Sequence, residues 1–251
     1  MTRLHAVVDP TQGHRLSDAV LRPVTTHAFE STVEQLATAV RLGVFARGEQ
    51  LPPERELAER LGVSRVTLRE AIAALRDSGL VTTRRGRGGG SLVVYDGPQM
   101  ASTRPVGSIV GRRGAALADA LDFRRVVEPG AAALAARRPL GADQRAWLRA
   151  ALSETTVASE PTAHRLADSR LHLAVATLSG SPMLIEAVTR AQAALHELLT
   201  AIPVLPRNIA HSDMQHQRVV AAILRADPEA ARIAMEEHCD ATSALLRGLL
   251  G

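Results

Sequence analysis

The sequence predicts a mainly α fold in two parts: a small N-terminal domain that includes a two-stranded β-hairpin, and an all-α antiparallel helical bundle. Three observations predict this fold. Apolar residues recur every three to four positions over most of the chain, as on one face of a helix. Short apolar runs flank a glycine-rich stretch near residue 87, as in a hairpin. A segment rich in Gly, Pro, Ser and Arg, residues 96–115, separates the two parts.

The domain boundaries follow from where the helical periodicity begins and stops. Residues 1–28 show no stable periodicity and are predicted to form a mobile arm. The first domain is expected at residues 29–95, the linker at 96–115, and the second domain at 116–251. Because 46% of the residues are hydrophobic, both domains can bury a core.

The composition limits the compartment and the partners. The sequence has no run of about 18 apolar residues that would span a membrane, and its first residues lack the apolar core of a signal peptide. A single cysteine, Cys239, excludes an internal disulfide, and we expect a cytoplasmic protein. Residues 1–95 carry 13 arginines against 10 acidic residues, whereas residues 116–251 carry 14 against 15. This basic excess in the first part is typical of a domain that binds a polyanion.

Two helices separated by a tight turn are predicted at the centre of the first domain, after an earlier helix that begins near residue 31. The first of the two runs from Glu54 to Leu61 behind Pro53, whose missing N–H needs no partner at a helix start. Gly62 ends this helix, and Ser64 caps the next one by accepting a backbone N–H.

The capped helix has an apolar face and a basic face. The apolar face comprises Leu68, Ala71, Ile72 and Leu75, and the basic face comprises Arg65, Arg69 and Arg76. Two short strands follow, at residues 80–83 and 91–95, joined by an arginine- and glycine-rich tip. This order of elements is a winged helix-turn-helix. Its exposed guanidinium groups suit DNA phosphates and guanine edges, and its glycines let the wing backbone approach a duplex closely.

The first domain resembles GntR-type transcriptional regulators over about residues 27–95. The resemblance lies in Leu51-Pro-Pro-Glu-Arg-Glu-Leu-Ala, in the stretch from Leu61 to Leu75, and in Gly79-Leu-Val. It implies double-stranded DNA as the partner and a set of residues that touch it: Arg55, Ser64, Arg65, Thr67, Arg69, Arg85 and Gly86.

The resemblance also implies where these groups lie on the duplex. Arg55 and Arg69 would fall near phosphates and base edges, and Arg85 and Gly86 would lie at the tip of the wing. Val66 occupies a position that is often Thr or Ser in relatives, a departure that bears on the operator sequence.

Six helices are predicted in the second domain, approximately at residues 115–137, 142–159, 162–178, 183–201, 207–226 and 228–248. Prolines and a Gly-Ser-Pro stretch mark the breaks between them. Pro129 lies inside the first of these helices and is expected to kink or split it.

Four polar residues lie on otherwise apolar faces of these helices: Asp168, His172, His216 and His238. Asp168 and His172 are four residues apart, so both can reach one ion. A carboxylate directed into a core is costly unless it is paired or binds a metal. Zinc accepts this ligand set, and nickel or manganese also fits it. Two alternatives stay open: the histidines are hydrogen-bonded core residues, and Asp168 pairs with an arginine.

The second domain resembles the FCD effector domain of the FadR branch of the same family, over about residues 115–248. The stretches that carry the resemblance are Asp168-Ser-Arg-Leu-His, Leu178-Ser-Gly-Ser-Pro-Met-Leu, and His216-Gln-Arg-Val-Val-Ala-Ala-Ile followed by His238. The resemblance implies that the four polar residues named above ligate a divalent metal ion.

The resemblance further implies a binding group for an effector. Arg124, in a stretch that resembles the first helix of the FCD domain, matches an arginine that meets the carboxylate of the effector. Ser181 stands where relatives usually have Asn, a departure that bears on the polar wall of the effector pocket.

We therefore expect a homodimeric DNA-binding regulator, not an enzyme, that recognises a near-palindromic operator and responds to a small carboxylate at a metal site. A fatty acyl thioester is the alternative effector, and the retained metal ligands argue against it. A different function also fits the residues: a metal-dependent hydrolase tethered to a DNA-binding domain, with Glu128 as the nearest general base. In a third interpretation the metal is purely structural.

Overall fold

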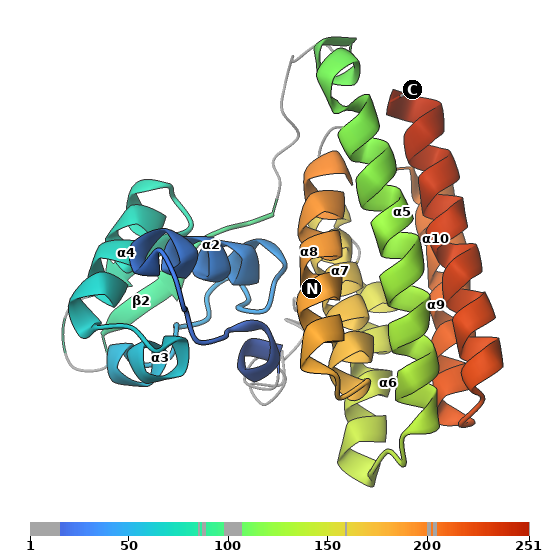
Figure 1. Ribbon diagram of the computed structural model, residues 1–251, viewed down its shortest axis with the longest axis horizontal. Coiled ribbons are helices and arrows are strands. Elements are labelled where there is room, and N and C mark those ends of the chain that lie inside the picture. The colour runs from blue at the N-terminus through green and yellow to red at the C-terminus, as the bar shows by residue number, and fades with distance from the viewer. Residues whose placement is uncertain are drawn as a thin grey trace, which may run out of the picture. The chain divides into compact units, whose positions relative to one another are not determined.

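The computed structural model describes residues 16–84, 86, 89–97, 107–158, 160–199, 202 and 205–250, except for the side chains of 107–116, 161, 206, 207 and 250. These residues are mainly helical and include one two-stranded sheet, so the predicted mainly α fold with a small β wing is confirmed (Figure 1). The chain divides into two compact units, one of residues 1–40 and 44–95, and the other of residues 41–43 and 96–251.

The first unit packs its helices through apolar faces that repeat at helical spacing. Its labelled elements are α2 (Ala28–Arg41), α3 (Glu54–Leu61), α4 (Arg65–Asp77), β1 (Val81–Arg84) and β2 (Gly90–Val93). Leucines from all three helices are fully buried: Leu36, Leu57, Leu61, Leu68 and Leu75. Removing this apolar surface from water holds the three helices together.

The turn between α3 and α4 has the geometry that the sequence predicts. Gly62 follows α3 with a φ of 64°, in the left-handed region that disfavours side chains with a Cβ. The hydroxyl of Ser64 accepts a hydrogen bond of 3.0 Å from the backbone N–H of Thr67, and so caps α4. These two residues set the angle at which α4 leaves the turn.

The wing is an antiparallel hairpin in which Val81 pairs with Val93. A third segment supports its base, because Gln50 forms an isolated bridge with Leu92. The Gln50 side chain also donates a 2.9 Å hydrogen bond to the carbonyl of Gly89, next to the wing tip. The segment that precedes α3 therefore fixes the root of the wing.

Residues 16–28, which the sequence predicts to belong to a mobile arm, are instead packed within the first unit. Residues 16–20 form a short helix, and Leu16 and Leu21 are only 2% and 3% exposed. Arg60 of α3 forms a 2.6 Å ion pair with Asp18, and the backbone N–H of Val24 donates to the carbonyl of Leu61. A helix of five residues is too short to show a period in the sequence. Residues 1–15 lie outside the described residues.

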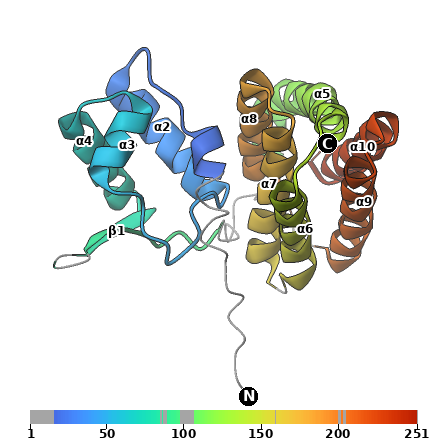
Figure 2. The ribbon, with the colours of Figure 1, turned by 90° about the horizontal axis from the view of Figure 1, so that it is seen from below.

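The second unit is a bundle of long helices, seen from their ends in Figure 2. Its elements are α5 (Gly107–Arg137), α6 (Ala142–Val157), α7 (Pro161–Leu178), α8 (Pro182–Leu199), α9 (Pro206–Leu224) and α10 (Pro228–Leu250). Helix α5 packs against α7, α8, α9 and α10. Side chains from the inner face of α5 therefore meet those of four other helices.

Helix α5 differs from its prediction at two places. It begins at Gly107, so the last residues assigned to the linker are helical. It also continues through Pro129, and the expected split is absent from this described segment. Burial on both sides of the proline, at Val127, Ala131 and Ala132, keeps the helix in place although one backbone hydrogen bond is lost.

Two glycine substitutions should shift stability in opposite directions. Gly62→Ala should destabilise the protein by about 1–2 kcal/mol, because alanine is strained at a positive φ. Gly130→Ala should stabilise it by about 0.5–1 kcal/mol, because Gly130 lies inside helix α5 with no atom near an added Cβ. Urea and thermal unfolding of both variants measure the effects. Two shifts of the same sign would contradict the assigned backbone conformations.

Candidate functional site

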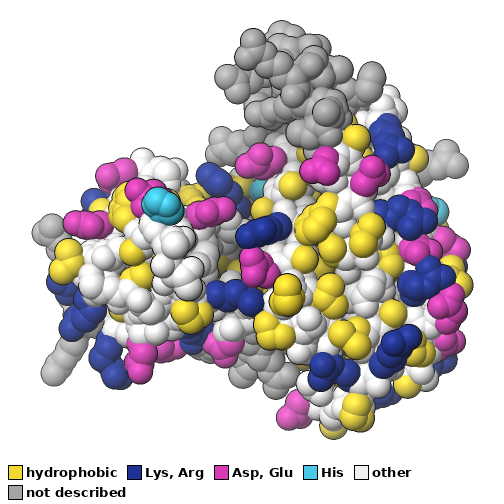
Figure 3. Space-filling view, viewed as in Figure 1, with side chains coloured by type: hydrophobic (Ala, Val, Ile, Leu, Met, Phe, Trp, Pro, Cys, Tyr) yellow, Lys and Arg dark blue, Asp and Glu magenta, His cyan; other side chains and the backbone are white. Residues whose placement is uncertain are grey.

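The exposed surface of α4 carries basic residues, as predicted. Arg65 and Arg69 are exposed, and Val66 between them is 66% exposed. Figure 3 shows basic side chains gathered along the edge of the unit that contains α4 and the wing. An exposed row of guanidinium groups beside a helix-turn-helix turn can contact phosphates and base edges in a major groove.

Arg69 is engaged by an acidic residue of the neighbouring helix. Its Nε donates a 2.7 Å hydrogen bond to Oε2 of Glu54 at the start of α3. The two side chains are 61% and 39% exposed, so water screens the pair strongly. The contact orients the guanidinium across the gap between α3 and α4.

Ser64 and Thr67 contribute to the turn through their hydroxyl groups. Besides capping α4, Ser64 Oγ lies 2.8 Å from Thr67 Oγ1 within hydrogen-bond distance. Ser64 is exposed and Thr67 is half-buried, so both hydroxyls lie near the surface, at the N-terminal end of α4. Their positions are therefore compatible with contacts to a phosphate, and their mutual hydrogen bond orients them.

The remaining residues assigned to DNA lie on α3 and at the wing. Arg55 is exposed on the first turn of α3. Gly86 is exposed with a φ of 107°, a conformation that favours glycine, and no atom lies within 4 Å of an added Cβ. Arg85 lies outside the described residues.

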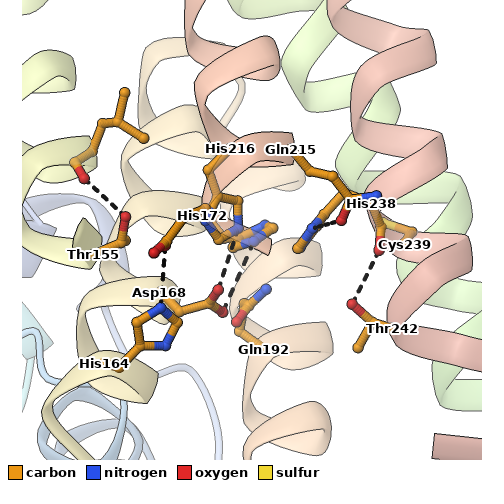
Figure 4. A network of polar contacts seen from close by, with 12 residues as sticks. Thr155, His164, Asp168, His172, Gln192, Gln215, His216, His238, Cys239 and Thr242 are labelled. Atoms are coloured by element: carbon orange, nitrogen blue, oxygen red, sulfur yellow. Dashed lines mark hydrogen bonds and ion pairs between the residues drawn. The ribbon is translucent and has the colours of Figure 1, made fainter. Parts of the chain in front are cut away.

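The second unit brings the four predicted metal ligands together. Asp168 and His172 come from successive turns of α7, His216 comes from α9, and His238 comes from α10 (Figure 4). One potential ligand atom from each lies within 4.8 Å of the others. The three histidines are almost fully buried, and the side chain of Asp168 is 15% exposed.

The ring nitrogens converge on the carboxylate of Asp168. His216 Nε2 lies 3.3 Å from Asp168 Oδ1, and His172 Nε2 lies 4.0 Å from Asp168 Oδ2. The ring centroids of His216 and His238 are 4.5 Å apart. Ligand atoms of a tetrahedral site with bonds of about 2.0–2.2 Å lie about 3.3–3.6 Å apart. The distance from His216 fits this range, and the distance from His172 is slightly larger.

The donor set fits a divalent metal ion. In the described structure, Nε2 of His172 and His238 and both nitrogens of His216 are buried without a hydrogen bond, which argues against ordinary hydrogen-bonded core histidines. Burial lowers the pKa of His216 to about 4 despite the nearby Asp168. Burial and the adjacent His216 hold the pKa of His238 well below its usual range. Both rings are therefore neutral at pH 7, the form that binds metals.

Two further residues orient the histidine rings. His238 Nδ1 lies 3.2 Å from Gln215 Oε1, an atom that can only accept, so the Nε2 of His238 is left as the lone-pair nitrogen. Glu128 Oε2 lies 2.7 Å from His172 Nδ1 and orients that ring in the same way. Neither of these roles is predicted from the sequence.

Glu128 is the centre of a fully buried polar network. Arg124 Nε donates to its Oε1 at 3.1 Å, and Gln192 Nε2 donates to the same oxygen at 2.6 Å. The Cys239 thiol donates to Oε2 at 3.8 Å. Although burial opposes ionisation, Arg124 and His172 lower the pKa of Glu128 to about 2. An ionised, fully engaged carboxylate is poorly suited to the role of general base that the hydrolase alternative requires.

Arg124 presents two unsatisfied donors beside the candidate metal site. Its side chain is 2% exposed, and neither Nη1 nor Nη2 has a hydrogen-bond partner among the described residues. Burial disfavours its charged form, but the Cys239 thiol and the Glu128 carboxylate raise its pKa above the ordinary value. The guanidinium therefore stays charged, with its two terminal nitrogens available.

A cavity of about 530 Å³ adjoins these groups. Arg124, Asp168 and His238 all line it, so the predicted effector residue and two of the predicted ligands face one space. Ser181 is not among its lining residues; its hydroxyl accepts from the backbone N–H of Leu184 at the start of α8 instead. Ser181 therefore makes no direct contribution to the wall of this cavity.

None of the described helices is long and apolar enough to cross a membrane. Comparison with known proteins matches both units. Residues 29–89 match the family described as bacterial regulatory proteins, gntR family, and residues 119–241 match the FCD domain.

RmpR of Mycobacterium gastri, whose name describes an HTH-type transcriptional regulator, is 31% identical over 215 residues, which cover 83% of this chain and 76% of RmpR. The chain belongs to the GntR family. A protein of Escherichia coli (strain K12) named for the regulation of an L-lactate dehydrogenase operon is 30% identical over 198 residues, 76% of this chain and 75% of its own. The solved structure of E. coli McbR/YncC shares the fold, with a TM-score of 0.52 and 22% identity over 89% of this chain and 99% of its own.

The GntR-family assignment makes this chain a DNA-binding transcriptional regulator with a C-terminal FCD domain, not an enzyme. The predicted family and the predicted class of function are thereby confirmed. The hydrolase alternative fails on two grounds: the relatives are regulators, and Glu128 is held in the network around Arg124 and His172.

Glu128→Gln should weaken metal binding by about 10–100-fold, because the neutral amide orients His172 less firmly than the carboxylate does. Metal titration of the full chain in competition with a chromophoric chelator measures the change. Glu154→Gln is the matched control, since Glu154 pairs with Arg170 elsewhere in the bundle. Equal metal affinities in the two variants would remove Glu128 from the support of the site.

Proposed function

We propose that this regulator binds a near-palindromic operator through α4 and the wing, with an affinity that a small organic acid controls from a metal site in the bundle. The observation that carries the proposal is Arg124: a buried, charged guanidinium with both terminal nitrogens unsatisfied, facing the same cavity as Asp168 and His238.

A carboxylate is the ligand that this arrangement favours. Leaving buried donors without a partner costs free energy, and a bound acceptor recovers it. The planar guanidinium matches the two oxygens of a carboxylate, which can accept from both terminal nitrogens at once. Glu128 does not satisfy the two terminal nitrogens of Arg124, since its Oε1 already accepts from Arg124 Nε and from Gln192.

The metal site would strengthen the same preference. Asp168, His172, His216 and His238 would hold a divalent ion, with zinc, nickel and manganese as candidates. A bound ion with an open position would supply Lewis acidity toward a ligand oxygen. One relative is named for an L-lactate dehydrogenase operon, and L-lactate is itself a small carboxylate.

Regulation then requires two conformations of the protein, which differ in the arrangement of the DNA-binding domains and in their affinity for the acid. The acid can change operator affinity only by as much as its own affinity differs between these two conformations. We propose a homodimer, in which two winged domains read two half-sites of one operator. Exposed apolar side chains on α5, Phe123 at 40% and Val126 at 75%, support association with a second copy.

Arg69→Ala should weaken operator binding by about 1–3 kcal/mol if Arg69 reads a base edge. The operator is first selected from random DNA with the purified protein, and affinity is then measured by fluorescence anisotropy. Arg190→Ala is the control, because Arg190 is likewise exposed and paired with a glutamate but lies in the bundle. An unchanged affinity in Arg69→Ala would remove this residue from the interface.

Removal of the metal should weaken the response to the acid, so that a higher acid concentration is needed. His172→Ala should lose the ion, because one of its four ligands and the contact to Asp168 are gone. Metal analysis of the purified variant tests the ligand set. His211→Ala is the control, since His211 lines the cavity but is not one of the four ligands. Full metal occupancy in His172→Ala would refute the proposed site.

The effector is sought with a thermal-shift screen of organic acids on metal-loaded protein, because a ligand that binds the folded state raises the melting temperature. Each acid that binds is then tested for a change in operator affinity, in the wild type and in Arg124→Ala. We expect the change only in the wild type. If chelation lowers stability and no acid alters DNA binding, the metal is purely structural and the proposed function is wrong.

A further inference from the structure

The cavity beside Arg124 extends well beyond the polar groups of the proposed site. Along α10 its lining runs from His238 to Leu245, seven residues or about 10 Å of helix. On α7 and α9 it runs toward the beginnings of the helices, and on α8 toward the end, at Leu195 and Leu199. All of these directions lead to the same end of the bundle, away from the four ligands.

The far part of the cavity is apolar on the side formed by α8, α10 and Ile202. Leu195 and Ile202 are 3% and 4% exposed and belong to a buried cluster of hydrophobic side chains. Leu199 and Leu245 pack against this cluster and also line the cavity. One end of the space therefore presents the guanidinium of Arg124, and one side of the other end presents aliphatic side chains.

Two of the polar residues that α7 contributes to this part of the cavity are satisfied by the protein, and α9 adds Asn208, His211 and Ser212 to the lining. His164 Nε2 lies 3.2 Å from Asp213 Oδ1, and Arg165 Nη2 donates a 3.1 Å hydrogen bond to the carbonyl of Ile202. These two side chains therefore need no hydrogen-bond partner from a ligand. An apolar ligand body in this region leaves neither of them without a partner.

The size of the cavity exceeds that of a lactate-like acid. A water molecule takes about 30 Å³ in the liquid, so 530 Å³ corresponds to about 18 water volumes. A ligand of about six heavy atoms bound at Arg124 leaves the apolar end unfilled, and the leucines there gain nothing from it. An extended chain advances about 1.2 Å per bond, so about eight carbons reach across 10 Å.

We infer that the effector is an amphipathic monocarboxylate, with its carboxylate at Arg124 and the metal centre and a hydrocarbon or aromatic body of about eight carbons against Leu195, Leu199 and Leu245. This inference rests on the proposed function, since it takes the carboxylate site as given. It adds the size and polarity of the rest of the ligand.

The test is a chain-length series measured by isothermal titration calorimetry on the Zn²⁺-loaded full chain. The probes are acetate, butanoate, hexanoate and octanoate, with L-lactate and 1-octanol as comparison ligands. We expect affinity to rise with each added methylene by up to about fourfold, equivalent to about 0.8 kcal/mol per buried CH₂. The heat capacity of binding should become more negative along the series. The octanol, which has the tail without the carboxylate, should bind at least tenfold more weakly than octanoate.

Different failures separate the inference from the proposed function. If L-lactate binds more tightly than octanoate, or affinity does not change with chain length, the apolar body is wrong while the carboxylate site stands. If no carboxylate binds, or octanol binds as well as octanoate, the carboxylate site itself is wrong. The series is repeated on metal-free protein, where Arg124 remains as the anchor: the same chain-length dependence should persist at lower affinity, and a flat series there would overturn the inference.

A pair of leucine variants on α10 locates the tail. Leu245→Gln should lower the ratio of octanoate affinity to acetate affinity by about tenfold, because an amide replaces an apolar wall. Leu249→Gln, one turn further along α10 and outside the cavity lining, should leave this ratio unchanged. Equal ratios in the two variants would overturn the inference. Should Leu245→Gln fail to fold, the wild-type series still decides.

Discussion

Arg124 and Glu128 carry opposite charges one helical turn apart on α5, and both side chains are almost fully buried. Charges in such a setting are costly, and the cost is offset only if hydrogen bonds satisfy the groups on every side. Glu128 meets this condition through Arg124, Gln192, His172 and Cys239, which come from four different helices. The packing of the bundle around α5 is thus tied to one carboxylate.

The same carboxylate links the two halves of the proposed effector site. One of its oxygens accepts from Arg124, and the other lies against the ring of His172. The arginine is left with its terminal nitrogens toward the cavity, and the histidine with its Nε2 toward Asp168. A displacement of α5 relative to α7 therefore cannot move the arginine without also disturbing the ligand histidine. This mechanical connection would place the proposed anion site and the proposed metal site in one rigid unit.

Local signals in the sequence predict most of the fold. The parts that the sequence does not predict depend on contacts between residues far apart in the chain. Ser64, Gly62 and the leucines of α3 and α4 act within a few residues, so the helix-turn-helix could be predicted element by element. The four proposed ligand residues interrupt apolar faces and could be identified from the sequence for that reason. The role of Glu128 was not, because charges four residues apart usually indicate an exposed pair, and Gln192 and Cys239 lie 64 and 111 residues away. The packing of residues 16–21 was missed since a five-residue helix shows no period.

The ion pair between Glu54 and Arg69 alters how the charge of the first domain acts on DNA. If Arg69 moves to a phosphate or a base, Glu54 loses its partner and takes up a cation from solution. Fewer ions are then released on binding than the number of arginine contacts implies, so operator affinity falls less steeply as salt concentration rises. The Glu54 carboxylate would also repel any duplex to which Arg69 makes no favourable contact. Glu54 would thereby restrain binding to random DNA, and in a cell with a large excess of such sites more of the regulator would stay free to find its operator.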